Sequence, residues 1–229
     1  MLAPMPEASF AALLRHQVSC CRCREGGDGP RAFAFPNTPR AYERDRPFRI
    51  EHIALDLTLD WDKRRVQGVA KLRVRRIAPA SHRLRLDAVS FELTSVALDG
   101  TATPYDYDDE VLSIEVPRKA TTFEVTISYG VEPRRGLYLL APDEHVQTGP
   151  LQVWSQGQDE DARCWFPCHD SPHEKQSTEV RVRIPRGFLA LSNGALVERR
   201  DDGDSTLVHF RQELQHPSYL VTLVVGRFA

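Results

Sequence analysis

The sequence predicts an all-β fold, a large curved antiparallel sheet or β-sandwich, with an irregular N-terminal extension before it. From about residue 48 onward, apolar and polar residues alternate with a period of two in many short runs, which is typical of strands with one buried face. Turn-forming residues separate these runs, and no long run with helical periodicity follows residue 48. Many closely spaced short strands without intervening helices favour an all-β sandwich or one large sheet.

The clearest alternating run comes first in this region, with Ile53, Leu55, Leu57 and Leu59 on one side of the expected strand. We expect further strands within residues 70–74, 84–86, 89–93, 112–116, 123–129, 180–184, 188–191, 207–210 and 219–225. The turn signals between these runs include the Asp-Gly pair at 99–100.

The first 46 residues differ from the rest of the chain. They contain one short apolar stretch, from Phe10 to Leu14, followed by Cys20-Cys21-Arg22-Cys23 and by loops rich in glycine and proline. Such a stretch has too little periodic apolar surface to offset the entropy that a chain loses when it is ordered. We therefore predict a weakly ordered or draped extension over residues 1–46 and a β-domain over residues 47–229.

Composition and charge argue against a nucleic-acid partner. The chain has 229 residues, enough for one large domain, and its hydrophobic fraction of 41% and charged fraction of 27% are ordinary for a soluble globular protein. Thirty basic and thirty-two acidic residues give a formal net charge of −2, so we expect no nucleic-acid partner. Lys71, Arg73 and Arg75 alternate along one expected strand, and we interpret them as its solvated face.

The sequence also predicts a protein without a membrane partner. It contains no run of about 18 apolar residues, and its N-terminus lacks the basic segment and the longer apolar stretch of a signal peptide. The cysteine count is five, an odd number that fits reduced thiols better than a secreted disulfide framework. We therefore expect a cytoplasmic location.

Two groups of residues resemble metal ligands. His169 and His173 are four residues apart, but Pro172 disfavours the helix that would bring both rings to one face, so we expect an ordinary loop. Cys20, Cys21 and Cys23, with His16, are an alternative zinc site, because thiolates suit zinc. Adjacent cysteines rarely both ligate with good geometry, so we prefer unligated thiols.

The most informative segment runs from Ser155 to Lys175 and contains two glutamines, a run of three acids and a Trp-Phe pair. It resembles a segment of the M1-family zinc aminopeptidases (aminopeptidase N and leukotriene A4 hydrolase-like enzymes), whose usual form is T-Q-x-E-x-x-D-A-R-x-x-F-P-C-x-D-x-P-x-x-K. The positions that match are Gln156, Asp161, Ala162, Arg163, Phe166, Pro167, Cys168, Asp170, Pro172 and Lys175. Two further stretches, 191–194 and 216–228, are similar to the family's L-S-N turn and to its closing strand.

The resemblance implies that this chain is the N-terminal β-domain of such an enzyme. In the family, Gln156 would line the pocket for the first side chain of a peptide, and Gln158 would meet its free α-amine. The family more often has Glu at the second position, and a neutral amide holds an ammonium less strongly than a carboxylate does. The resemblance further implies that Arg163, Asp170 and Lys175 shape the loop rather than touch the substrate.

Zinc chemistry in the family belongs to the domain that follows, which supplies H-E-x-x-H. The 229 residues contain no such motif and stop at Ala229, where the resemblance places the start of that domain. We therefore expect neither catalytic residues nor metal ligands in this chain, and zinc only in the full-length enzyme. The expected partners are peptides with a free N-terminus and the missing catalytic domain.

The residues leave two functions open for the β-domain, and a third for the N-terminal extension, a regulatory tail in which Cys20, Cys21 and Cys23 bind zinc. The first is a substrate-anchoring domain of a zinc aminopeptidase, inactive alone because the zinc motif is missing. The alternative is a non-catalytic β-domain that serves as a protein-interaction scaffold. The presence of both Gln156 and Gln158 favours the first function, because a scaffold does not need them.

Overall fold

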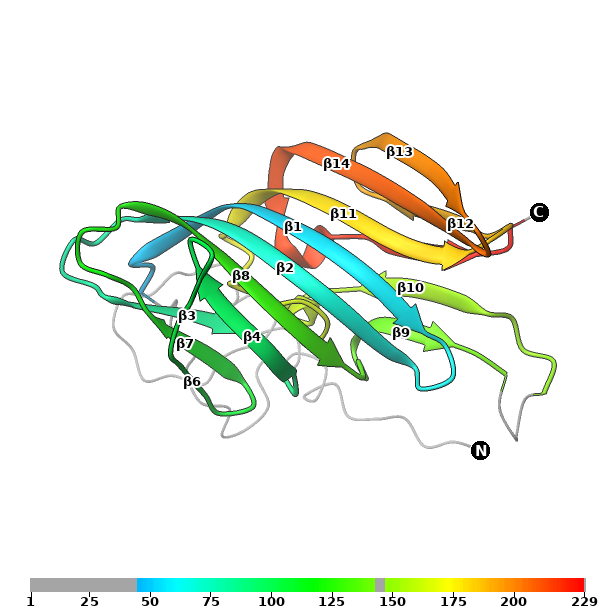
Figure 1. The fold of residues 1–229 in the computed structure, drawn as a ribbon, viewed down its shortest axis with the longest axis horizontal. Coiled ribbons are helices and arrows are strands. Elements are labelled where there is room, and N and C mark those ends of the chain that lie inside the picture. Colours follow the sequence, from blue (N-terminus) through cyan, green and yellow to red (C-terminus); the bar gives the residue numbers. More distant parts are fainter. Residues whose placement is uncertain (1–44, 143–146, 229) are drawn as a thin grey trace, which may run out of the picture. The chain divides into compact units, whose positions relative to one another are not determined.

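The computed structural model describes residues 45–142 and 147–228, and these residues form three β-sheets (Figure 1). The all-β prediction is confirmed, since the only helical elements in the described ranges are two short 3-10 helices, η2 (Ala162–Cys164) and η3 (Ser218–Leu220). No helix in those ranges has the length and apolar character needed to cross a membrane. The predicted extension, residues 1–46, lies outside the described residues except for its last two positions.

The largest sheet has eight strands. In spatial order they are β13 (Ala195–Asp202), β14 (Ser205–Pro217), β11 (Lys175–Pro185), β1 (Phe48–Asp60), β2 (Arg65–Arg76), β8 (Thr122–Val131), β4 (Glu92–Leu98) and β5 (Thr101–Ala102). The sheet is mixed rather than purely antiparallel, because β1 and β11 run parallel, with His52 opposite Ser177. These two strands are far apart in the chain, so no tight hairpin forces them to be antiparallel.

The core lies against one face of this sheet. Its central ladder pairs Ile53 with Leu72 and Leu55 with Ala70, and all four side chains are buried, as the alternating pattern predicts. On β8, Phe123, Val125, Ile127, Tyr129 and Val131 are buried in the same way. The buried clusters on the three sheets are continuous.

Two smaller sheets complete the described part of the chain. One contains, in order, β12 (Leu189–Ser192), β15 (Leu223–Gly226), β10 (Gln152–Gln156) and β9 (Gly136–Leu140), and the other contains β3 (Arg83–Asp87), β7 (Val111–Glu115) and β6 (Tyr105–Tyr107). The turn predicted at 99–100 joins β4 to β5, and both of its residues have positive φ, as a tight hairpin of twisted strands requires.

Two of the expected strands begin later than predicted. Within residues 89–93 the strand starts only at Glu92, because the amide of Val89 donates to the Arg163 carbonyl and not to a neighbouring strand. Within residues 219–225 it starts at Leu223, because residues 218–220 form η3. The structure also contains strands that the alternation did not predict, among them β9, β10 and β13.

Candidate functional site

The segment 155–175 joins β10 to β11. Gln156 is the last residue of β10, the next residues form a turn that leads into η2, and an irregular stretch then continues to Lys175, where β11 begins. No helix forms over residues 169–173, in agreement with the effect predicted for Pro172. The segment is therefore a loop between two strands that belong to different sheets.

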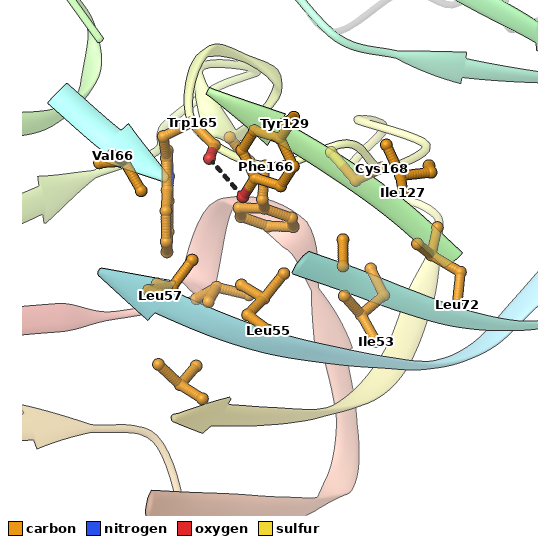
Figure 2. Packing of buried hydrophobic residues seen from close by; sticks show 14 of the residues in the cluster. Ile53, Leu55, Leu57, Val66, Leu72, Ile127, Tyr129, Trp165, Phe166 and Cys168 are labelled. Carbon is orange, nitrogen blue, oxygen red and sulfur yellow. Dashed lines mark hydrogen bonds between the residues drawn. The ribbon is translucent and has the colours of Figure 1, made fainter. Parts of the chain in front are cut away.

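Two aromatic side chains hold the middle of this loop in the core. Trp165 and Phe166 are completely buried and make an edge-to-face contact with ring centroids 4.6 Å apart. Figure 2 shows both rings beside Leu55 and Leu57 of β1, and the Tyr129 hydroxyl donates a 2.9 Å hydrogen bond to the carbonyl of Trp165. Burial of each ring stabilises this arrangement by roughly 2–3 kcal/mol.

An ion pair between partly buried Arg163 and buried Asp170 joins the two parts of the loop that flank Trp165 and Phe166. Asp170 Oδ2 accepts hydrogen bonds from the Arg163 backbone N–H at 3.0 Å and from its Nε at 3.2 Å. Asp170 in turn donates its own amide to Asp87 Oδ2 at 2.9 Å, and the Arg163 Nη2 group donates to Glu160 at 2.7 Å. These contacts agree with the expectation that Arg163 and Asp170 shape the loop, whereas Lys175 is exposed at the start of β11.

Burial and neighbouring charges shift the pKa values of both Asp170 and Arg163. Burial raises the pKa of Asp170 to about 6, although the hydrogen bonds and charge of Arg163 favour its ionised form. Burial also disfavours the charged form of Arg163, but Asp87 and Asp170 outweigh it and raise the pKa of Arg163. Arg163 therefore stays charged, and the pKa of about 6 makes Asp170 sensitive to pH near neutrality.

The two glutamines lie on the exposed edge of this held loop. Gln156 and Gln158 are both exposed, and neither side-chain amide has a hydrogen-bond partner among the residues that the structure describes. The peptide bond between Gln158 and Asp159 is cis. Their amides are thus available to a ligand, while the backbone that carries them is tied to the core.

The remaining candidates are placed as follows. Cys164 and Cys168 are buried and unpaired, as predicted, and burial raises the pKa of both thiols. Within residues 45–142 and 147–228, no three His, Cys, Asp or Glu side chains are grouped so that they could hold a metal ion. The cysteine group at 20–23, with His16, lies outside the described residues.

Sequence reasoning missed an apolar face beside the glutamines. We call it the outer apolar face; it lies on the four-stranded sheet and consists of Leu189, Leu191, Val224, Trp154, Tyr138 and Leu140. Trp154 is 40% exposed and stacks on Tyr138 with ring centroids 4.4 Å apart, and Leu191 is 57% exposed. Gln156 follows Trp154 by two residues on β10, so it points to the same side of the sheet.

Comparison with known proteins identifies this fold. The model of the peptidase M1 N-terminal domain matches residues 38–220. The leukotriene A-4 hydrolase homolog of Botryotinia fuckeliana is 28% identical over 212 residues, which cover 85% of this chain and 33% of that protein. Aminopeptidase B of Rattus norvegicus is 28% identical over 211 residues, which cover 80% of this chain and 32% of that protein.

Solved structures have the same fold. Native yeast LTA4 hydrolase superposes with a TM-score of 0.69 at 21% identity over 80% of this chain and 30% of that chain. An M1 zinc metallopeptidase from Deinococcus radiodurans gives a TM-score of 0.65 at 20% identity over 79% of this chain and 42% of that chain. The chain spans about a third of the length of the curated relatives it matches. It belongs to the peptidase M1 N-terminal domain family.

Proposed function

We propose that this chain is the substrate-anchoring domain of a zinc aminopeptidase, an enzyme that removes N-terminal residues from peptides. The observation that carries the proposal is the pair Gln156 and Gln158, two exposed amides without a partner in residues 45–142 and 147–228, on a loop that Trp165 and Phe166 tie to the core. The pair therefore favours a binding role over a purely structural one.

The chemistry of an amide suits the amino terminus of a peptide. A glutamine carbonyl oxygen accepts hydrogen bonds from an ammonium group, and an acceptor held in place loses little entropy when the ligand arrives. We assign the α-amine to Gln158 and the first side chain of the peptide to Gln156. The M1 zinc metallopeptidase of Deinococcus radiodurans has been solved with the substrate Tyr-Ser-Ala, and yeast LTA4 hydrolase with bestatin, which supports a peptide ligand.

A second domain completes the proposed enzyme. One of the similar structures is described as a two-domain M1 zinc metallopeptidase, and this fold covers 43% of it. The described residues do not fit a zinc ion, since they contain no group of three suitable ligands, so we assign zinc to that second domain. We propose that it packs on the outer apolar face, because an exposed aromatic and aliphatic surface of this kind is typical of an interface and Gln156 lies at its edge.

The decisive test is Gln158→Ala in the protein made from the complete coding sequence. Loss of a hydrogen bond to a charged group should lower kcat/KM for peptides with a free N-terminus by roughly 10- to 150-fold, or about 1.5–3 kcal/mol. Gln67→Ala is the matched control, because Gln67 is an exposed glutamine on β2, outside the loop. Unchanged kinetics in Gln158→Ala would remove the assigned role.

Reading the coding frame beyond Ala229 tests the rest of the proposal. A continuation into H-E-x-x-H would supply the zinc ligands that the described residues lack. A stop codon would instead favour the alternative function, a non-catalytic interaction scaffold. We also propose a cytoplasmic location, which the two buried and unpaired cysteines Cys164 and Cys168 support.

A further inference from the structure

We infer that the large sheet carries a docking surface for an acidic peptide segment on the face that is turned away from the core. Lys71, Arg73 and Arg75 alternate along this face of β2, and all three side chains are exposed. Strand pairing continues the cations onto β1, β11 and β14, which follow β2 in that order across the sheet (Figure 1). We call this surface the basic face. Its cations are Arg49, Lys71, Arg73, Arg75, Arg181 and Arg211.

The acid on β1 is shared between two cations of the basic face. Glu51 Oε1 accepts a 2.8 Å hydrogen bond from Arg75 Nε, and Glu51 Oε2 lies 3.6 Å from Arg73 Nε. The Glu51 side chain is 27% exposed, whereas those of Arg73 and Arg75 are 58% and 47% exposed. One negative charge therefore meets two positive charges, and the cations are the groups that face the solvent.

The acid on β11 is shared in the same way. Glu179 Oε1 lies 2.9 Å from Nη2 of Arg211, and Glu179 Oε2 lies 3.9 Å from Nη2 of Arg181. His209 also contacts Glu179, with 2.9 Å between Nε2 and Oε2. Glu179 is only 13% exposed, while the side chains of Arg181 and Arg211 are 48% and 52% exposed. A ligand that approaches this part of the sheet therefore meets guanidinium groups before it meets the carboxylate.

The charge of the basic face is positive, although the formal net charge of the whole chain is −2. The rows from Arg49 to Asp56 of β1, with their partners on β2, β8, β11 and β14, contain the six cations and four acids. The acids are Glu51, Asp56, Glu124 and Glu179. An excess of two positive charges is therefore concentrated on one face of the sheet.

The spacing of the cations suits an extended peptide. Outward side chains of one strand are about 6.7 Å apart, and alternate side chains of an extended peptide have the same separation. A carboxylate at every second position can thus meet Lys71, Arg73 and Arg75 in turn, and guanidinium groups bind carboxylates through paired hydrogen bonds. Ala54 lies opposite both Lys71 and Glu179, so its small side chain leaves a shallow floor between β2 and β11.

The basic face favours an acidic peptide over a nucleic acid or a membrane. Bases of single strands stack on exposed aromatic rings, and helices at a membrane surface insert apolar side chains. None of the large apolar side chains of β1, β2 and β11 is exposed. The inference is independent of the proposed function, since Gln156 ends a strand of the four-stranded sheet.

The test measures the binding of fluorescein-labelled oligoglutamate to the complete protein by fluorescence anisotropy. We expect binding that weakens as salt is added, because salt screens exposed charges. Lys71→Glu should weaken it about fivefold or more, since a repulsion replaces an attraction. Lys71 has no ion pair within residues 45–142 and 147–228, so this change breaks none there. The matched control is Lys63→Glu, an equal change of charge at an exposed lysine in the turn between β1 and β2, which should alter the affinity less than about twofold.

A second variant tests the place of binding rather than the charge. Ala54→Phe raises the floor of the basic face and leaves every charge unchanged, so it should weaken the binding of oligoglutamate at least about twofold. An unchanged affinity in Ala54→Phe would overturn the inference, because the peptide would then respond only to the field of the protein.

Three other results would also overturn it. The first is that oligoglutamate does not bind to the parent protein, and the second is that Lys71→Glu and Lys63→Glu weaken the binding equally. The third comes from oligouridylate and from vesicles that contain phosphatidylserine, measured with the same proteins. If either of them binds more tightly than oligoglutamate and depends on Lys71, the partner is a nucleic acid or a membrane and not an acidic peptide.

Discussion

At the scale of single residues, the raised pKa of Asp170 predicts how the stability of the folded protein changes with pH. Its pKa is about 6 in the folded protein, against 3.8 for an ordinary aspartate, so the folded state binds this proton more tightly than the unfolded state does. The stability it contributes is present below pH 3.8 and is lost as the pH rises through 6. The loss is on the order of 3 kcal/mol, and burial of the carboxyl is its cause.

The variant Asp170→Asn isolates this effect, because its amide oxygen can still accept from the Arg163 amide but cannot titrate. We expect the parent to lose stability as the pH rises from about 4 to 7, whereas the variant keeps it. The unfolding free energy of the variant minus that of the parent, from urea titrations, should therefore rise by roughly 2–3 kcal/mol over this range. Burial lowers the pKa of His52 and His216, which lowers stability as the pH falls below 6.5, but both are present in the two proteins and cancel in the difference. A difference that moves the other way would mean that Arg163 outweighs burial.

At the scale of elements, Gly68 on β2 packs against Tyr129, whose hydroxyl donates a hydrogen bond to the Trp165 carbonyl in the loop 155–175. A Cβ atom at this position of β2 would lie 2.6 Å from Cζ of Tyr129, and that ring is stacked on Phe91 with centroids 4.8 Å apart. Gly68→Ala should therefore shift the tyrosine, weaken its hydrogen bond to the Trp165 carbonyl and cost about 1–3 kcal/mol of unfolding free energy.

A double-mutant cycle with Tyr129→Phe tests this coupling by urea unfolding. Removing the hydroxyl from the parent protein should cost about 1–2 kcal/mol, because the buried Trp165 carbonyl loses its donor. In the Gly68→Ala background the same change should cost at least about 0.5 kcal/mol less. Additive costs would show that the loop does not depend on this contact.

The strands differ in how far the sequence could predict them, for a physical reason. Alternation marks β1, β2 and β8 because one face of each is buried while the other meets solvent. All eight residues of the edge strand β13 are exposed, so no apolar pattern is required there. The strand β10 is short, and its outer face carries the exposed Trp154. Apolar residues therefore lie on both of its faces, and the sequence does not alternate between apolar and polar residues.

The candidate site also contains features that the sequence could predict and one contact that it could not. The motif in residues 155–175 pointed to Gln156 and Gln158, and it predicted the structural role of Arg163 and Asp170. The approach of Gly157 to Tyr219 joins residues 62 positions apart, and nothing local in either stretch signals it. Contacts of this kind arise from packing between two backbones, so only a structure can reveal them.

At the scale of the whole molecule, the outer apolar face leads to a prediction about how the protein unfolds. In the 229-residue chain, Leu191 is 57% exposed, so Leu191→Lys should change the unfolding free energy by no more than about 0.5 kcal/mol. In the complete protein, the same change would place a charge in the proposed interface with the second domain. Because a buried unpaired charge is costly, the two domains should then unfold in separate calorimetric transitions.

The matched control is Leu214→Lys, since Leu214 is 78% exposed on β14 of the large sheet, away from the outer apolar face. This variant should unfold like the parent in both the short chain and the complete protein, because no partner is proposed for that surface. Scanning calorimetry of the parent and the two variants, each as the 229-residue chain and as the complete protein, gives the answer without an activity assay. If both leucine variants behave alike in the complete protein, the second domain does not pack on the four-stranded sheet, and the arrangement proposed around Gln156 has to be placed elsewhere.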